Sequence, residues 1–180
     1  MYKNRFIKAI KILKMGGVIA FPTETVYGIG AALNQPAAIK RIFKIKNRPR
    51  SKPLQVLVST LDEAKSLGVF NKQALSLAKA WPGPLTLVVN KTNLVPKLVT
   101  GGTQKVGLRI PDHKIVLALI NKIGPLVATS ANKAGEEPAL TAQRVKEILP
   151  EIDFIIPGRV KIGKSSKVIE VGKKSKILRK

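Results

Sequence analysis

The stretch Gly16-Gly17-Val18-Ile19-Ala20-Phe21-Pro22 decides the fold class. An apolar run that begins after two glycines and stops at a proline predicts a buried strand over residues 18–21. Before it, residues 4–15 carry apolar side chains at helical spacing with lysines between them, which predicts an amphipathic helix. After it, Pro36 begins a second predicted helix with a charged outer face. A buried strand between two helices is typical of an α/β domain.

The same alternation of strands and helices continues to the end of the chain. Apolar runs predict strands at residues 54–58, 85–89, 106–110, 126–129, 153–156 and 168–171. Capping patterns predict helices from Thr60 to Gly68, from Asn71 to Trp81, over 113–123 with Asp112 as N-cap, and over 142–149 with Thr141 as N-cap. We therefore expect a single domain over residues 1–180 with a twisted, mixed sheet. Ligands of such sheets bind beyond the strand ends, so the loops at those ends decide the function.

The composition excludes several classes of chemistry. The chain has no cysteine, which excludes thiol nucleophiles and cysteine zinc sites, and its one histidine, His113, excludes a multi-histidine metal site. Acidic residues number only 10, and Glu24 is the sole acid before Asp62, so a carboxylate-rich metal cage is excluded too. No apolar run approaches the roughly 20 residues that span a bilayer. Because the N-terminus is also too charged for a signal peptide, we expect a cytoplasmic protein with no membrane partner.

The net charge of +23 is extreme for 180 residues. It indicates a polyanionic partner, such as a nucleic acid or nucleotide phosphates, or else a lysine-rich surface with no dedicated ligand. The segment Lys46-Asn-Arg48-Pro49-Arg50-Ser-Lys52 narrows that choice, because residues 37–52 contain seven Lys and Arg and no acid. Its prolines limit the freedom of the turn, so its cations lose less entropy on binding. We favour phosphate binding over a solvated basic loop.

Three other segments place polar groups in or after predicted strands. In Phe21-Pro-Thr23-Glu-Thr25-Val-Tyr27-Gly28-Ile-Gly30, the two threonines point to the same side and the two glycines permit close approach of a ligand. Arg109 lies within a predicted central strand, where it needs an acidic partner or a cleft. Because acids are few, we expect it to recognise a carboxylate or phosphate. Thr129, Ser130 and Asn132 can donate hydrogen bonds to an anion, although a structural turn remains an alternative there and in the first segment.

The segment Gly158-Arg-Val-Lys-Ile-Gly163-Lys164-Ser165 matches the pattern of a phosphate-binding loop letter for letter. Such a loop requires a following helix whose N-terminus faces the phosphates. The residues that follow, 167–171, alternate like a strand, and the stretch from Ser165 to Lys180 is too short for the rest of such a core. We therefore predict that this match is a false one.

Taken together and in this order, these segments resemble the YrdC-like family, and within it the single-domain threonylcarbamoyl-AMP synthases. The resemblance rests on FPTETVYGIG, IFKIKNRPRSKPL, WPGPLTLVV, VGLRIPDH, PLVATSANKAGEEPALTAQRV and the final KILR, which span nearly the whole chain. It implies an open twisted α/β sheet, flanked by helices, around a basic concave cavity. It also implies nucleotidyl transfer, in which L-threonine, bicarbonate and ATP give threonylcarbamoyl-adenylate and pyrophosphate. A separate transferase complex then modifies an adenosine in some tRNAs.

By position, the resemblance implies a site around the family's K-x-R and S-x-N signatures. The residues implied to be catalytic are Lys46, Arg48, Ser130 and Asn132. The residues implied to bind substrates are Thr25 for threonine, Lys52 with Lys46 and Arg48 for the phosphates, Arg109 for a threonine or carbamate carboxylate, and Ser166 and Arg179 for the nucleotide. No metal ligand is implied, and any Mg²⁺ would be held mainly by ATP and water.

Two departures and two alternatives accompany the resemblance. Ser166-Lys167-Val-Ile-Glu170 stands where the family commonly has Ser-Thr-Val-Val-Asp, and Leu57 stands where some longer relatives have a histidine. We also expect no second domain after Lys180. The main alternative is a double-stranded RNA or ribosome-associated binding protein of the same fold, which would bind RNA or tRNA in a strongly salt-dependent way without turnover. The second is a paralogue of the same fold with another acyl-adenylate chemistry, although the intact pair Lys46 and Arg48 favours the synthase.

Overall fold

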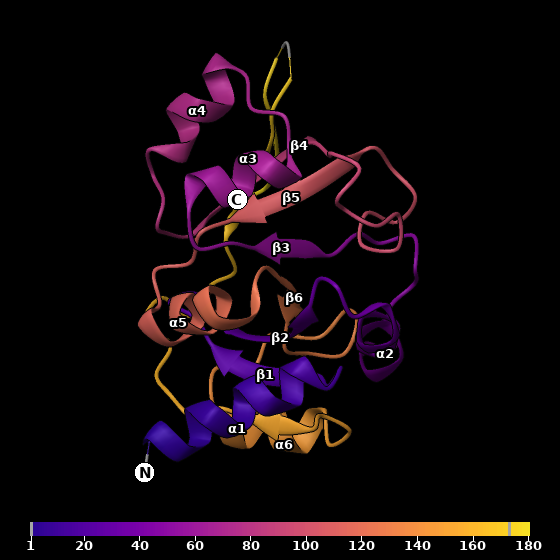
Figure 1. Cartoon of the computed structure of the whole chain (residues 1–180), viewed down its shortest axis with the longest axis vertical. Helices are drawn as coiled ribbons and strands as arrows, with labels where there is room; N and C mark the ends of the chain where they lie inside the picture. Colours follow the sequence, from indigo (N-terminus) through magenta and orange to yellow (C-terminus); the bar gives the residue numbers. More distant parts are fainter. Residues whose placement is uncertain (1, 173) are drawn as a thin grey trace.

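The computed structural model describes residues 2–172 and 174–180, and within them it contains one open, nine-stranded sheet flanked by helices (Figure 1). The strands lie in the order β7-β1-β2-β6-β3-β5-β4-β8-β9. Their bounds are β1 Ile19–Pro22, β2 Tyr27–Ala32, β3 Gln55–Leu57, β4 Leu85–Asn90, β5 Lys105–Arg109, β6 Leu126–Ser130, β7 Phe154–Ile155, β8 Lys167–Glu170 and β9 Lys176–Arg179. The helices are α1 Tyr2–Lys14, α2 Pro36–Lys46, α3 Leu61–Leu67, α4 Lys72–Ala78, α5 Lys114–Ile123 and α6 Ala142–Ile148. The sheet contains both parallel and antiparallel neighbours, so the predicted α/β class with an open, mixed sheet is confirmed.

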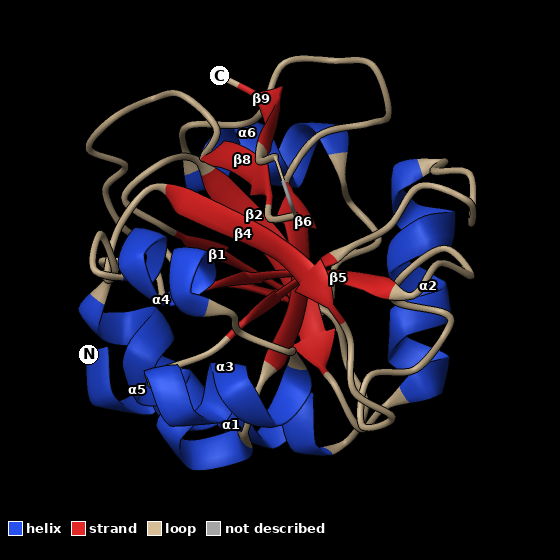
Figure 2. Ribbon diagram, turned by 90° about the horizontal axis from the view of Figure 1, so that it is seen from above, coloured by secondary structure: helices blue, strands red, loops and turns tan. Residues whose placement is uncertain are grey.

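The two faces of the sheet pack against different helices. On one face, α2, α3 and α6 contribute to a large apolar cluster that includes Ile39 and Val56. On the other face, α1 and α5 lie side by side and bury Leu13, Phe21 and Leu119 (Figure 2). This second cluster takes side chains from β1, β3 and β6, but none from β4, β5 or β8. The β5-β4-β8 part of that face is therefore left without helical cover.

Most predicted elements are found where the sequence places them. The side chains of Thr60, Asn71 and Thr141 cap α3, α4 and α6 as predicted, each accepting a hydrogen bond from the backbone three residues on. The N-cap prediction for Asp112 was wrong, because His113 occupies the N-cap position of α5 and makes no side-chain capping bond. Asp112 pairs instead with Lys161 at 3.5 Å.

The predicted end of α4 at Trp81 was also wrong, because the helix stops at Ala78. The next three residues form a tighter turn, in which each N–H bonds to the carbonyl three residues earlier. Pro82 explains this, since the residue before a proline is disfavoured in the helical conformation. The indole N–H of Trp81 donates to the Leu85 carbonyl at 2.7 Å, and its ring packs against the core.

Two strands were not predicted. β2 pairs with both β1 and β6, and its glycines serve that packing. A Cβ at Gly30 would lie 2.6 Å from the Val127 carbonyl oxygen, and one at Gly28 would lie 3.3 Å from the Phe21 ring. The interpretation of Gly30 as a place for ligand approach was therefore wrong, whereas Gly28 also lies on a cavity wall. The second unpredicted strand, β9, is exposed and pairs with β8.

The rejection of the phosphate-loop match is confirmed. Residues 158–165 contain no helix, and the next element is strand β8. The backbone of this segment bonds instead to the β1–β2 turn, where Lys161 and Ile162 both donate to the Glu24 carbonyl. Across the described residues, no helix combines the length and apolarity needed to cross a bilayer.

Candidate active site

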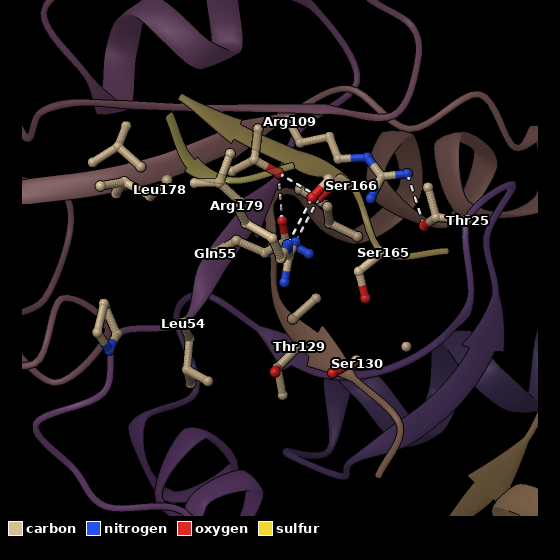
Figure 3. Close-up of a pocket in the computed structure, with 18 of the residues that line it drawn as sticks. Thr25, Leu54, Gln55, Arg109, Thr129, Ser130, Ser165, Ser166, Leu178 and Arg179 are labelled. Atoms are coloured by element: carbon tan, nitrogen blue, oxygen red, sulfur yellow. Dashed lines mark hydrogen bonds between the residues drawn. The ribbon is translucent and has the colours of Figure 1, made fainter. Parts of the chain in front are cut away.

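A cavity of about 400 Å³ opens on the sheet face that α1 and α5 leave uncovered (Figure 3). Its floor includes Gln55 from β3, Thr86 from β4 and Gly107 from β5. Gly107 keeps this floor open, because a Cβ there would lie only 3.2 Å from the Thr86 methyl carbon. The ionisable side chains on the lining are Arg48, Lys105, Arg109, Arg179 and Glu170. Lys105 and Glu170 pair with each other, which leaves three guanidinium groups around the cavity.

Arg109 reaches the cavity from the end of β5 and is 2% exposed. Its Nε donates to the Gly83 carbonyl at 3.0 Å, and its Nη2 donates to Glu24 Oε1 at 2.6 Å and to Thr25 Oγ1 at 3.1 Å. Burial lowers the pKa of Arg109, and the Glu24 charge opposes that shift. We expected Arg109 to bind a ligand because acidic partners are few. That argument is corrected, because Glu24, the lone acid before Asp62, forms an ion pair with Arg109. Arg109 is thus a cavity residue held by a buried ion pair.

The hydroxyl groups of Thr23 and Thr25 lie 2.7 Å apart in the turn between β1 and β2. Thr23 donates its proton to the Val26 carbonyl at 2.7 Å, so the shared proton comes from Thr25. Thr25 then accepts from Arg109, which fixes its hydroxyl in one orientation. Thr25 lines the cavity, and a hydroxyl oxygen has two lone pairs, so Thr25 Oγ1 can accept a second hydrogen bond from a substrate.

Arg48 and Arg179 are held by neutral groups rather than by acids. Arg48 donates to the carbonyl oxygens of Lys52 and Pro53 at 3.2 and 2.8 Å. Arg179 donates to the Ser166 carbonyl at 2.8 Å and to the Ser166 hydroxyl at 3.0 Å. Burial lowers the pKa of both arginines, and the charges of Arg109 and Arg48 lower that of Arg179 further. The mutual repulsion of these cations is relieved when an anion enters the cavity.

A directed chain of hydrogen bonds crosses the cavity floor (Figure 3). Thr86 donates to Gln55 Oε1 at 2.9 Å, so Ser166 must donate to Thr86 across their 2.9 Å contact, and Ser166 in turn accepts from Arg179. The amide oxygen of Gln55 accepts the last hydrogen bond of this series, from Thr86. Gln55 therefore presents its amide N–H groups, which are hydrogen-bond donors, to a ligand.

Lys46 lies behind the cavity wall instead of on it. It is 1% exposed, and its amino group donates to the carbonyls of Ser130 and Asn132, both at 2.5 Å, and to Asn132 Oδ1 at 2.9 Å. Ser130 Oγ donates to the same Asn132 oxygen at 2.6 Å. Burial, followed by the charge of Arg48, lowers the pKa of Lys46 to about 7. The lysine thus ties the end of α2 to the turn that presents Ser130.

The structure brings some of the implied site residues to the cavity and leaves others outside its lining. On the lining are Thr25, Arg48, Arg109, Ser130, Ser166 and Arg179. Lys46 and Asn132 are buried behind it, and the exposed Lys52 contributes its carbonyl to Arg48. Gln55, Thr86 and Glu24 were missed by sequence reasoning. Gln55 and Thr86 could have been found as polar residues inside apolar predicted strands. Glu24 could have been found as the one acidic residue before Asp62.

The chemistry available to this cavity is anion binding and charge neutralisation. Among residues 2–172 and 174–180, no group of three or more His, Asp or Glu could hold a metal ion. Three guanidinium groups with fixed orientations are suited to phosphate and carboxylate oxygens. Arg109 has only its Nη1 protons left for a ligand, because Gly83, Glu24 and Thr25 accept the others. The lining therefore fits a ligand with phosphate or carboxylate oxygens.

Comparisons with known proteins agree with this geometry. Residues 11–180 match the model of the family Sua5/YciO/YrdC, described as "Telomere recombination". A threonylcarbamoyl-AMP synthase of Pyrococcus abyssi is 40% identical over 168 residues, covering 91% of this chain and 49% of that protein. The synthase of Xanthomonas campestris is 39% identical over 160 residues, with 84% of each protein covered.

A solved structure extends the comparison to three dimensions. The crystal structure of P. abyssi Sua5 complexed with L-threonine superposes with a TM-score of 0.93 at 39% identity, over 97% of this chain and 53% of that one. The chain thus spans about half the length of the Pyrococcus relative and most of the length of the Xanthomonas relative.

Proposed function

Because the chain belongs to the Sua5/YciO/YrdC family, we propose that it is a threonylcarbamoyl-AMP synthase. The amino group of L-threonine and bicarbonate first give a carbamate with loss of water. A carbamate oxygen then attacks the α-phosphorus of ATP, a new P–O bond forms, and the bond to pyrophosphate breaks. The products are threonylcarbamoyl-adenylate and pyrophosphate.

One observation carries this proposal: three guanidinium groups meet around a cavity that also presents oriented hydroxyls and amide N–H groups. A reaction between a carbamate and a triphosphate brings two anions together, so its main barrier is charge repulsion and positioning. Arg48 and Arg179 neutralise the phosphates and the leaving pyrophosphate. Arg109 and Thr25 hold the carboxylate and hydroxyl of threonine. Ser130 Oγ, whose proton goes to Asn132 Oδ1, accepts a hydrogen bond from the substrate beside them.

The rest of the predicted chemistry follows from the same reaction. Mg²⁺ would arrive bound to ATP oxygens and water, with Glu170 as the one carboxylate on the described lining. The adenylate product is a mixed anhydride, so a transferase that carries the threonylcarbamoyl group to tRNA must act next. Because this chemistry uses ATP and tRNA, we place it in the cytoplasm.

The test is pyrophosphate release from ATP by the purified chain. We expect release only when L-threonine and bicarbonate are both present, with threonylcarbamoyl-adenylate detected by mass spectrometry. Release without threonine, or no release with all three substrates, would overturn the proposal. Salt-dependent binding of duplex RNA without turnover would support the alternative of an RNA-binding module, which the similarity to the synthases does not favour.

A further inference from the structure

A second hollow lies between the first turns of α1 and α5, apart from the active-site cavity. Its volume is about 330 Å³, and no residue is shared between its lining and that of the active-site cavity. Phe6 and Ile115 are among its apolar lining residues, together with Ile156 and Pro157, and its cations are Lys3, Arg5 and Lys114. We call this hollow the α1–α5 groove.

The groove is apolar because it is the uncovered edge of the core. Ala9 and Leu13 on α1 are fully buried under the fold, whereas Phe6 on α1 and Ile115 on α5 are only partly buried against the same cluster. Apolar side chains from another molecule would extend the core at this edge and remove the exposed surface from water.

The charge around the groove has one sign. α1 carries five Lys and Arg, α5 carries two Lys, and neither helix contains an acid. Asp112, which precedes α5, is already paired with Lys161. The floor of the groove is therefore apolar, and its rim carries cations that have no acidic partner on their own helices. A ligand with apolar side chains flanked by carboxylates complements both features.

From this complementarity we infer that the α1–α5 groove binds an acidic amphipathic segment of a partner protein. A single-stranded nucleic acid is disfavoured, because among the described lining residues Phe6 is the only aromatic ring on which a base could stack. A membrane surface is disfavoured as well, because Ala9 and Leu13, in the apolar stripe of α1, are buried within the fold and cannot enter lipid. The inference does not depend on the proposed synthase activity.

The experiment uses a fluorescent peptide of about 14 residues with leucines at helical spacing and glutamates between them. We expect it to bind the wild-type chain in a fluorescence anisotropy titration. Lys114→Glu should weaken binding at least about tenfold, because it places a carboxylate on the rim of the groove. Lys122→Glu, which makes the same charge change on the same helix outside the groove, should weaken binding about twofold or less.

Ala118→Asp, which places a carboxylate among the apolar residues of the groove, should also abolish binding. Thermal unfolding of each variant checks its fold, and the exposed Lys114 keeps the test valid if Ala118→Asp fails to fold.

Three results would overturn the inference. The first is a wild-type chain that does not bind the peptide, or that binds it equally well when serines replace the leucines. The second is an equal loss of binding in Lys114→Glu and Lys122→Glu, which would mean diffuse charge attraction. The third is binding of duplex RNA or phosphatidylglycerol vesicles that Lys114→Glu removes while peptide binding is unchanged.

Discussion

The arginines that line the active-site cavity fall into two groups according to what holds them, which we call the Glu24 side and the Arg48–Arg179 side. Arg109 is anchored by the buried carboxylate of Glu24, whereas Arg48 and Arg179 are anchored by carbonyl and hydroxyl oxygens. The Glu24 side therefore offers oriented donors with little net charge. The Arg48–Arg179 side offers two cations without an acid. This difference suits the first side to an amino acid and the second to a triphosphate.

The largest expected effect is on the side without an acid. Arg48→Ala removes a cation that would neutralise the leaving pyrophosphate, so kcat/KM for ATP should fall by about 1,000-fold. Pyrophosphate release measures this, with circular dichroism to show that the fold is retained. Arg50→Ala is the matched control, because Arg50 is exposed in the same turn and does not line the cavity. An equal loss in both variants would mean that the turn acts only by its overall charge.

The next effect is on stability, at the Glu24 side. Glu24→Ala leaves the guanidinium of Arg109 buried without its partner and should lower the free energy of unfolding by about 3 kcal/mol or more. Glu170→Ala breaks the more exposed pair with Lys105 and should cost at most about 1 kcal/mol. Urea unfolding of both variants measures the difference. Equal losses would show that burial of the Glu24–Arg109 pair has no energetic consequence.

A smaller, pH-dependent effect is expected at Lys46, which is buried behind the cavity wall. Its pKa is about 7 in the folded chain and 10.5 when unperturbed, so between these values the unfolded chain binds more protons. The free energy of unfolding should therefore rise with pH across this window, by at most about 1.4 kcal/mol per pH unit. Below the window Lys46 is protonated in both states, so it should add no pH dependence. Lys46→Met should remove this slope in denaturant titrations. The same slope in both proteins would contradict the assignment.

The smallest effect is expected at Lys52. Its side chain is exposed and is not part of the cavity lining, and its backbone carbonyl accepts the hydrogen bond from Arg48. Lys52→Ala should therefore change kcat/KM by about twofold or less. A loss comparable to that of Arg48→Ala would return Lys52 to the phosphate path that the sequence implied.

Local signals made most of the fold predictable. The caps at Thr60 and Thr141 and the apolar run before Pro22 act over a few residues, so the sequence displays them directly. β2 could not be predicted in this way, because Tyr27-Gly-Ile-Gly-Ala-Ala has weak strand propensity. It is a strand because β1 and β6 pair with it on both sides, and this is a non-local cause.

Residues of the active-site cavity were predictable where a single residue stands out from its neighbours in the sequence. Arg109 and Thr25 are conspicuous among apolar or glycine-rich neighbours, and both line the cavity. The sequence could not show that Lys46 turns inward while Arg48, two positions later, faces the cavity. That choice depends on the Asn132 turn, which lies far away along the chain. Gln55 was missed for the same reason, since Thr86 comes from another strand.

Calorimetric binding tests the division between the two sides most directly. L-threonine and a non-hydrolysable ATP analogue are titrated separately into the wild type, Arg48→Ala and Arg109→Lys. We predict that Arg48→Ala loses affinity for the nucleotide and keeps its affinity for threonine, and that Arg109→Lys does the reverse. Equal loss of both ligands in either variant would contradict the division.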